Sequence, residues 1–496
     1  MGVVIKQSFW GTVIAYLGVI VGYVNTLYFR AEFFDLEQIG LFTLITSHAM
    51  IVSPVSSFGM GNSYIKFFPA FQTKNKHRFF SFLFLITVIG NAIILTAGYF
   101  MKNIIASRYI ESAPDYINYL SITAIIIVSN SFFDLFFNYG KTIMKVLFPS
   151  FLRDIYLRFG SLLLVIGYAI NWWNFDSAIV GLGVVYFSAF LFLLIQLLIF
   201  GFRFDFRIGI INGEWRYKLL KFGSYSMLMA GTFALINNVS YDQITAILGP
   251  EMNGIFTTCF FIALIVEMPK RNMAKVITPI LSSELEKNNF KEVSQLYKRS
   301  SITMSIIGML IFIGIVTNLQ DLLNFIPKGD EFQKGFWVVI GVCLAKLVLM
   351  VSSFSGEIIS YSKLYKYNLL FQALAAILLI ALNYFLIPKY GLNGAVTSYL
   401  LTITIHVFVK MLFIKYHFDM YPFIKTHLPL IAIGLIIVFL AFTIQPNLHP
   451  VINIVIRSIL TALIFTLLIY RFKISEDINK IIHSTFERFL KINLPK

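Results

Sequence analysis

The stretch Asn383-Tyr-Phe-Leu-Ile-Pro-Lys-Tyr-Gly-Leu-Asn-Gly-Ala-Val-Thr-Ser-Tyr-Leu400 separates two apolar runs and predicts a tight helical hairpin. The first run starts near Leu369, and we expect Pro388 to end it, because proline has no N–H and its ring clashes with the preceding turn. Residues 389–391 then make the bend. Small residues at 391, 394 and 395 open the second run, and small residues let helix backbones approach closely inside a membrane.

The composition of the whole chain also indicates a membrane protein. The 496 residues are 58% apolar and only 13% charged, whereas about a quarter of the residues of a soluble protein are charged. The two cysteines, Cys259 and Cys343, lie within apolar runs and show no paired spacing, so neither a disulfide framework nor a zinc site is supported. Lys6 precedes an apolar run of about 21 residues, which is too long for a signal-peptide core and predicts a retained first span.

The apolar runs predict an all-α polytopic membrane protein with about fourteen spans. A hydrocarbon core about 30 Å thick requires about 20 apolar residues in a helix. The predicted spans are 9–29, 39–61, 79–101, 116–138, 151–170, 177–201, 219–239, 253–269, 301–318, 335–356, 367–387, 392–414, 428–445 and 451–470.

The distribution of Lys and Arg predicts the orientation. With the N-terminus in the cytoplasm, 31 of the 40 Lys and Arg fall on cytoplasmic segments and six on the opposite side. Basic residues concentrate on the cytoplasmic side of membrane proteins. We therefore expect a cell inner (cytoplasmic) membrane protein with both termini in the cytoplasm. The same distribution accounts for the net charge of +16 and removes nucleic acid as a partner.

The segments outside the spans are short. No stretch longer than about 30 residues interrupts the spans, and no metalloprotease, P-loop, nucleophile-elbow or paired-cysteine motif is present. We expect no enzyme, no metal site and no cofactor. The C-terminal residues 473–496 have apolar residues at helical spacing behind a possible cap, Ser475, which predicts an amphipathic helix on the membrane surface.

An internal repeat relates the two halves of the chain. Gly40-Leu-Phe-Thr43 opens the second predicted span, and Gly254-Ile-Phe-Thr257 opens the eighth, 214 residues later. Two further pairs, Asn25 with Asn238 and Pro54 with Pro269, recur within one residue of that offset. Six spans between the copies predict a parallel repeat about an axis along the membrane normal.

The repeat predicts a fold with two six-helix bundles related by a pseudo-twofold axis, a cavity between them and two added spans. The predicted parts are 1–212 for the first bundle, 213–426 for the second, 427–472 for the added spans and 473–496 for the amphipathic helix.

Two motifs carry a resemblance to a known family. The hairpin pattern of Asn383, an apolar run, Ile-Pro, Lys-Tyr-Gly and Gly-Ala resembles the signature in the second half of polysaccharide flippases of the polysaccharide transport family. Phe58-Gly-Met-Gly-Asn-Ser-Tyr-Ile-Lys-Phe-Phe-Pro69 resembles the end of that family's second helix and its following loop. The family lies in the multidrug/oligosaccharidyl-lipid/polysaccharide superfamily, whose architecture is the two-bundle body predicted above.

The resemblance implies a flippase for a lipid-linked oligosaccharide, carried on a polyprenyl pyrophosphate, in surface polysaccharide biosynthesis. The implied partners are that substrate, membrane lipids, and the polysaccharide polymerase and glycosyltransferase machinery. The rival is a multidrug antiporter of organic cations from the same superfamily, which would need an acidic, aromatic cavity, whereas the deepest charges here are basic. A membrane polymerase or glycosyltransferase would need longer outer loops.

Ionisable residues inside spans are the candidate site residues, since burying a charge there costs about 2.5 to 3.5 kcal/mol. Lys346 lies near the middle of its span, where it either contacts an anionic substrate or pairs with a neighbouring carboxylate. Arg158 has the same two alternatives, because Asp154 precedes it by one turn. Arg457 is close enough to a span end for its charge to reach the interface. Lys66 matches the family motif and is a candidate headgroup contact.

The remaining candidates are polar, acidic or conformational. Asn25 and Asn238 are candidate substrate contacts at equivalent repeat positions. Candidate gate or coupling residues, each with an ordinary helix-packing or ion-pair alternative, are Asp134, Asp154, Glu267, Glu357 and His48. Pro54 is a possible hinge and Pro269 a possible helix end, and Gly59 and Gly61 favour close helix packing over a phosphate cradle.

Overall fold

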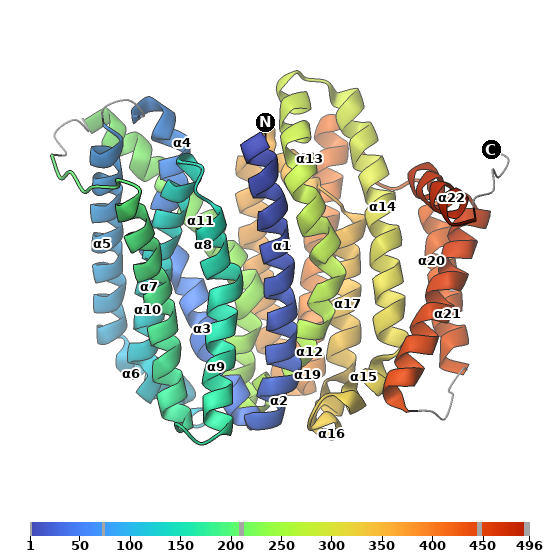
Figure 1. Cartoon of the computed structure of the whole chain (residues 1–496), viewed down its shortest axis with the longest axis horizontal. Helices are drawn as coiled ribbons and strands as arrows, with labels where there is room; N and C mark the ends of the chain where they lie inside the picture. Colours follow the sequence, from blue (N-terminus) through green and yellow to red (C-terminus); the bar gives the residue numbers. More distant parts are fainter. Residues whose placement is uncertain (1, 72–74, 208–212, 444–448, 491–496) are drawn as a thin grey trace. The chain divides into compact units, whose positions relative to one another are not determined.

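The computed structural model describes residues 2–71, 75–207, 213–443 and 449–490, and every regular element in these ranges is a helix. The chain divides into two compact units, Met1–Thr257 and Thr258–Lys496. The bundle boundaries predicted from the sequence repeat remain a prediction. Each unit is described by itself below (Figure 1).

The first unit consists of long helices joined by short turns. Its elements are α1 (Gly2–Val24), η1 (Asn25–Phe29), α2 (Arg30–Phe33), α3 (Leu36–Ser56), α4 (Met60–Phe71), α5 (Lys76–Phe100), α6 (Lys102–Tyr109), η2 (Pro114–Tyr119), α7 (Leu120–Thr142), α8 (Leu147–Phe151), η3 (Leu152–Tyr156), α9 (Leu157–Ala169), α10 (Phe175–Ile199), α11 (Gly213–Leu248) and the first part of α12 (Pro250–Ala263).

Helix α3 is at the centre of this unit, because it packs against both α7 and α11. Its start is defined by a capping box, in which the backbone N–H of Asp35 donates to the Gln38 side chain at 3.1 Å. Such a cap satisfies backbone donors that the first helical turn leaves unpaired. Helix α10 begins in a similar way, with the Asn174 side chain accepting from the Ser177 N–H at 2.9 Å.

An aromatic core fills the unit at the end where α4 follows α3. Tyr64 of α4 is fully buried, and its ring lies 5.5 Å from Phe79 and 5.6 Å from Tyr139, between ring centroids. Phe71 stacks on Phe79 at 4.3 Å. Aromatic pairs add packing energy beyond the area they bury, so this core fixes α4 against α5 and α7.

The second unit begins within α12 and also consists of helices. Its elements are η5 (Leu264–Glu267), α13 (Met268–Glu286), α14 (Phe290–Thr317), α15 (Leu319–Phe325), α16 (Gly329–Phe332), η6 (Gln333–Gly335), α17 (Phe336–Val351), α18 (Ser355–Tyr361), α19 (Lys366–Phe418), α20 (His427–Thr443), α21 (Pro450–Arg471) and α22 (Glu476–Leu490). Helix α17 packs against α14 and α19, and α14 also packs against α20.

The predicted hairpin is present within α19. Gly391 has φ 58° and ψ −136°, values outside the helical region. Phe371 and Phe413, on either side of this break, have ring centroids only 5.1 Å apart, so the chain doubles back. One detail of the prediction was wrong: the helix continues through Pro388 and breaks three residues later. Proline weakens a helix, but a positive-φ glycine reverses its direction.

The helices confirm a multi-pass membrane protein. Among the described residues, eleven helices are long and apolar enough to cross a membrane, one of them being the folded-back α19, and His427–Ala441 is a shorter apolar helix. Large apolar side chains such as Ile93 and Phe439 are exposed on helix surfaces, as a lipid environment requires. The count of fourteen spans stays a prediction.

The C-terminal prediction is tested over part of its length. Helix α22 covers Glu476–Leu490, and the Ile478 N–H lies 3.5 Å from the Ser475 hydroxyl, which is the geometry of the predicted cap. Residues 491–496 of the predicted amphipathic helix lie outside the described residues.

Candidate functional site

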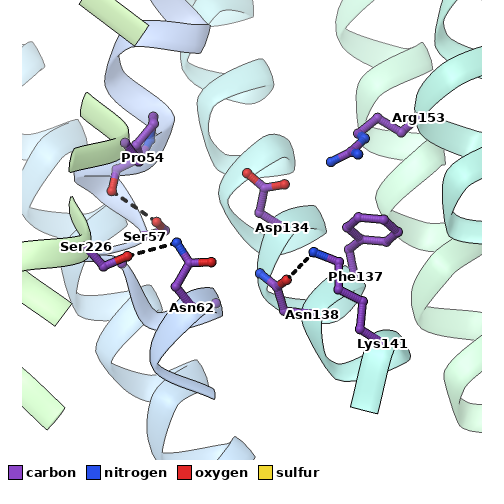
Figure 2. Close-up of a pocket in the computed structure, with 12 residues that line it drawn as sticks. Pro54, Ser57, Asn62, Asp134, Phe137, Asn138, Lys141, Arg153 and Ser226 are labelled. Atoms are coloured by element: carbon purple, nitrogen blue, oxygen red, sulfur yellow. Dashed lines mark hydrogen bonds between the residues drawn. The ribbon is translucent and has the colours of Figure 1, made fainter. Parts of the chain in front are cut away.

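A cavity of about 210 Å³ opens within the first unit where α3 gives way to α4. Residues of α7, η3 and α11 line its other sides (Figure 2). The residues that line it are Pro54, Ser57, Gly59, Gly61, Asn62, Asp134, Phe137, Asn138, Lys141, Arg153, Ser226 and Ala230.

The break between α3 and α4 creates this space. Pro54 lies inside the last turn of α3, and the backbone then takes positive φ at Phe58 and at Gly59. A Cβ at position 59 would come within 2.5 Å of the Gly223 carbonyl oxygen, and one at position 61 would come within 2.5 Å of the Asn138 side chain. Gly59 and Gly61 therefore allow close helix packing, as the sequence predicted.

Two cations flank one aromatic ring on the wall of the cavity. The Lys141 Nζ lies 4.6 Å from the Phe137 ring centroid, and the Arg153 guanidinium carbon lies 4.5 Å from it. The Lys141 ammonium donates to the Asn138 amide oxygen at 2.8 Å. Because the ring attracts both cations to its faces, it holds two positive charges close together at the cavity wall.

Asp134 is the acidic residue among those that line the cavity. Its side chain is exposed to the cavity, and both Lys141 and Arg153 lie within electrostatic range of its carboxylate. Across the cavity, the Asn62 amide donates to the Ser226 hydroxyl at 2.9 Å (Figure 2). The lining thus carries two cations and one carboxylate, a net charge of +1, together with amides and hydroxyls. Such a set can hold an anion with oxygen acceptors.

In the second unit, Lys346 of α17 is 1% exposed and forms an ion pair with Glu267. The Lys346 Nζ lies 2.7 Å from a Glu267 carboxylate oxygen, and the rings of Phe260 and Tyr399 lie 5.7 and 5.6 Å from it. Arg271 approaches the other carboxylate oxygen at 3.5 Å. The structure thus shows the carboxylate partner that the sequence left as one alternative, and a substrate contact by Lys346 stays a prediction.

More cations surround this pair. The Lys270 ammonium donates to the Leu349 carbonyl at 3.1 Å, and Lys410 is 7% exposed. Glu357 of α18 lies within electrostatic range of both lysines. Glu267 and Glu357, which the sequence placed as separate gate candidates, thus share one charged cluster. Pro269 lies in the first turn of α13, where proline is well tolerated.

The predicted contacts Asn25 and Arg158 lie at the interface of α1 and α9. The Asn25 amide donates to the Ser161 hydroxyl at 3.1 Å, and Arg30 donates to the same hydroxyl at 2.7 Å. A Cβ on Gly22 would lie 3.3 Å from the Arg158 side chain. Asp154 forms an ion pair with Arg153 at 3.9 Å.

Both helices of this interface contain a π-helical turn. These turns are η1 after α1 and η3 before α9, and η3 packs against α1 while η1 packs against α9. Gly18 of α1 makes room for the η3 backbone, since a Cβ there would overlap the Asp154 carbonyl. Single π turns inside α-helices are frequent at functional sites.

Three other candidates have local partners. The Lys66 ammonium lies 3.8 Å from the Phe222 ring centroid. The Asn238 amide donates to the Ala234 carbonyl one turn earlier at 2.8 Å. Arg457 of α21 donates to the Thr317 carbonyl at 2.8 Å and to Asp321 at 2.9 Å. A role of Lys66 and Asn238 in substrate binding stays a prediction, whereas Arg457 connects α21 to the end of α14.

His48 lies apart from the cavity and bonds to Asp242 of α11 at 2.6 Å. Sequence reasoning named His48 and Asp134, but it did not select Asp242, Lys141 or Arg153 as site residues. A signal for Lys141 was present, because Phe137 is one turn from it on α7. The approach of Arg153 from η3 depends on helix packing and could not be predicted from the sequence.

Comparison with known proteins establishes the fold. No family model matches the chain, and no curated protein sequence matches it either. A solved structure described as the lipid II flippase MurJ in an inward closed conformation matches with a TM-score of 0.77 at 14% identity, over 94% of this chain and 99% of that one.

Two transporter structures also match. An inward-facing multidrug resistance MATE family transporter of the MOP superfamily has a TM-score of 0.62 at 11% identity, over 82% of this chain and 94% of that one. A MOP superfamily transporter from Pyrococcus furiosus, described as having a binding pocket of reversed polarity, has a TM-score of 0.58 at 11% identity, over 84% and 94%. At these identities the likeness shows a shared fold, which confirms the predicted fold class.

Proposed function

We propose that this protein is a transporter of the MOP superfamily that flips a lipid-linked oligosaccharide across the cytoplasmic membrane. The substrate we propose is an oligosaccharide on a polyprenyl pyrophosphate, for surface polysaccharide. In this proposal both termini are cytoplasmic, and the cavity of the first unit receives the headgroup from that side.

The observation that carries the proposal is the placement of Lys141 and Arg153 on the Phe137 ring at the cavity wall. A pyrophosphate cannot cross hydrocarbon unaided, because an unpaired buried charge costs many kcal/mol. Two adjacent cations replace part of the water that stabilises its charge. Amide and hydroxyl groups from Asn62, Asn138 and Ser226 suit the sugar hydroxyls.

The fold also supports the proposed flippase function. The likeness to a lipid II flippase covers nearly the whole of both chains, and a fold of this kind transports by exposing a central site to one side and then the other. We infer that the lipid tail stays in the bilayer while the headgroup moves. The protein supplies charge and shape but no reaction, so we propose no enzymatic activity.

The rival is an antiporter of organic cations. Asp134 favours it, because this carboxylate is exposed to the cavity next to an aromatic ring. The two cations oppose it, since they leave the cavity with a net positive charge. The two candidates therefore differ in the sign of the charge they bind.

Reconstitution in proteoliposomes tests the proposal. The assay follows transbilayer movement of a short sugar on a lipid pyrophosphate, with a fluorescent organic cation in parallel. We expect Lys141→Gln and Arg153→Gln each to slow movement of the sugar lipid. Lys145→Gln is the matched control, because the Lys145 ammonium lies over the Phe200 ring at 4.3 Å and the residue is not part of the cavity lining.

The outcomes are distinct. Sugar-lipid movement that depends on Lys141 and Arg153 but not on Lys145 supports the flippase. Exchange of the organic cation with a stationary sugar lipid would establish the antiporter instead. Movement of the sugar lipid at the wild-type rate in all three variants would show that the cavity does not bind the headgroup.

A further inference from the structure

A second polar cluster lies at the opposite end of the first unit from the cavity. Asp242 of α11 is 9% exposed and accepts hydrogen bonds from three side chains on two other elements. His48 Nε2 of α3 lies 2.6 Å from one carboxylate oxygen, the Tyr109 hydroxyl of α6 donates to the same oxygen, and Arg108 donates to the other. One carboxylate therefore joins α3, α6 and α11.

The cluster holds the segment between α5 and α7 in place. This segment comprises α6 and η2, and its Tyr109 and Tyr116 are each 1% exposed. The Tyr116 hydroxyl bonds to His48 Nδ1, so both tyrosines reach the same imidazole. Figure 1 shows α6 at the end of α5 that is distant from the N-terminus of α1. The segment is thus fixed to α3 and α11 through His48 and Asp242.

The hydrogen bonds define one protonation state in which every partner is satisfied. A neutral His48 with its proton on Nε2 donates to Asp242 and accepts at Nδ1 from the Tyr116 hydroxyl. Tyr109 donates to Asp242, and the charges of Arg108 and Asp242 cancel. In this state the cluster is neutral, and each hydrogen-bonding atom of the imidazole has a partner.

One added proton changes this balance. A proton bound at Nδ1 makes His48 a cation that donates from both nitrogens, and the Tyr116 oxygen must then accept. Two cations now share one carboxylate. They repel each other in a buried place, where charges interact more strongly than in water. Arg108 is the partner that can leave, because its side chain is 50% exposed and reaches solvent.

We propose that His48 and Asp242 form a proton-binding site that acts as a latch. Neutral His48 keeps Arg108 on Asp242 and the segment 102–119 closed, whereas a proton taken up by His48 displaces Arg108 and loosens that segment. A histidine is suited to this role because it is the side chain that ordinarily changes charge between about pH 5 and pH 8. This goes beyond the proposed transport function and does not depend on its substrate.

The groups that face His48 are few, which makes the assignment specific. Helix α11 contributes Asp242, α6 contributes Arg108 and Tyr109, and η2 contributes Tyr116. Helices α2, α5 and α7 also pack against α3. Their charged residues lie elsewhere: Arg30 and Glu32 in α2, before α3 begins, and the others in the first turn of α5 and at the cavity end of α7. The segment η2 also contains Asp115, whose side chain is exposed.

Hydrogen exchange of the backbone amides in residues 102–119, without any substrate, tests the latch. Comparison of variants with wild type at the same pH removes the intrinsic pH dependence of exchange. His48→Gln keeps an amide donor for Asp242 but cannot become a cation. We expect wild type to exchange about as slowly as this variant near pH 8 and about tenfold faster near pH 5, because only the wild-type imidazole can become a cation.

Two further variants complete the test. Asp242→Asn removes the charge that holds Arg108, and we expect fast exchange of this segment at every pH. His77→Gln is the control for removing a histidine, because His77 lies in the first turn of α5 beside Arg203, and we expect it to match wild type. Exchange that is equally pH-dependent in wild type and His48→Gln would overturn the proposal, as would slow exchange in Asp242→Asn.

Discussion

Gly40 of α3 lies against Pro250, and its repeat partner Gly254 of α12 lies against Leu36. Leu36 and Pro250 are themselves 214 residues apart, the offset that separates the two glycines. Contacts that exchange partners under one offset are what a two-fold axis produces. The Asn253 amide also donates to the Gly40 carbonyl at 3.1 Å. The repeat predicted from the sequence is therefore visible where α3 and α12 begin.

Because the helices approach so closely here, adding a single methyl group at either glycine should reduce the stability of the protein. A Cβ on Gly40 or on Gly254 would overlap a backbone carbonyl that cannot move aside. We expect Gly40→Ala and Gly254→Ala each to destabilise the protein by about 1 to 3 kcal/mol, the usual cost of overpacking. Thermal unfolding in detergent measures the effect.

The control for these variants is Gly98→Ala in α5, where a Cβ would meet nothing within 4 Å. Alanine is a better helix former than glycine by up to about 1 kcal/mol, so this change should be neutral or stabilising. Equal effects at positions 40 and 98 would show that α3 and α12 are not in close contact.

The buried pair of Lys346 and Glu267 predicts strong coupling between two substitutions. We expect Lys346→Met to cost about 3 to 5 kcal/mol, because it leaves the Glu267 charge buried with only the more distant Arg271. Adding Glu267→Gln should recover part of that loss. Unfolding of both single variants and the double variant measures the coupling. If Lys346→Met were as stable as wild type and only transport failed, a structural pair would be the wrong description.

The hairpin in α19 predicts that a substitution of its turn glycine destabilises the protein through backbone conformation alone. Gly391 has φ 58° and ψ −136°, and a Cβ there would meet nothing within 4 Å. Gly391→Ala should therefore cost about 1 to 3 kcal/mol through backbone strain alone. Pro388→Ala should be neutral or stabilising, because the helix continues through that position. A larger loss for Pro388→Ala than for Gly391→Ala in thermal unfolding would place the turn at the proline.

Asp205 predicts an acid-sensitive contribution to stability. Hydrogen bonds from Arg207, and a further one from Arg78, hold the pKa of the Asp205 carboxyl well below its usual range. A lowered folded-state pKa stabilises the fold at pH values above the unfolded pKa of about 3.9, and this stabilisation is lost as the pH falls towards the folded value.

We therefore expect Asp205→Asn to have a lower midpoint of thermal unfolding than wild type near pH 6, and the difference to shrink near pH 3. Glu286→Gln, which removes an exposed carboxylate on α13, should show no such convergence. A difference between wild type and Asp205→Asn that stays constant across this range would contradict a lowered pKa at Asp205.

Much of the fold could be predicted because membrane helices are defined by local sequence. Apolar length marks a span, and the small residues around Gly391 mark the hairpin. The end of the first arm was placed at Pro388, since a proline signal is local, while the reversal depends on the positive φ of Gly391. Interruptions such as η3 were not predicted, because a π turn leaves no mark in hydropathy.

The site was less predictable, because its charges meet across helices. Lys346 was identified from its depth in a span, but its pairing with Glu267 depends on how η5 packs against α17. Asp242 lies beyond the predicted span 219–239, although α11 extends past it to Leu248 and buries it beside His48. The position of a charged residue within a predicted span shows that it is unusual, but only the packing of the helices determines its partners.

The two π-helical turns, η1 and η3, each add an extra residue to a helix at the interface of α1 and α9. A π turn contains one residue more than an α turn needs. Conversion of either turn to α geometry would shift the adjoining helix by about 1.5 Å and rotate it by about 100°. Arg153 and Asp154 both lie within η3, so such a change would move the Arg153 guanidinium relative to Phe137. Such a change at η3 would therefore alter the position of positive charge at the cavity wall.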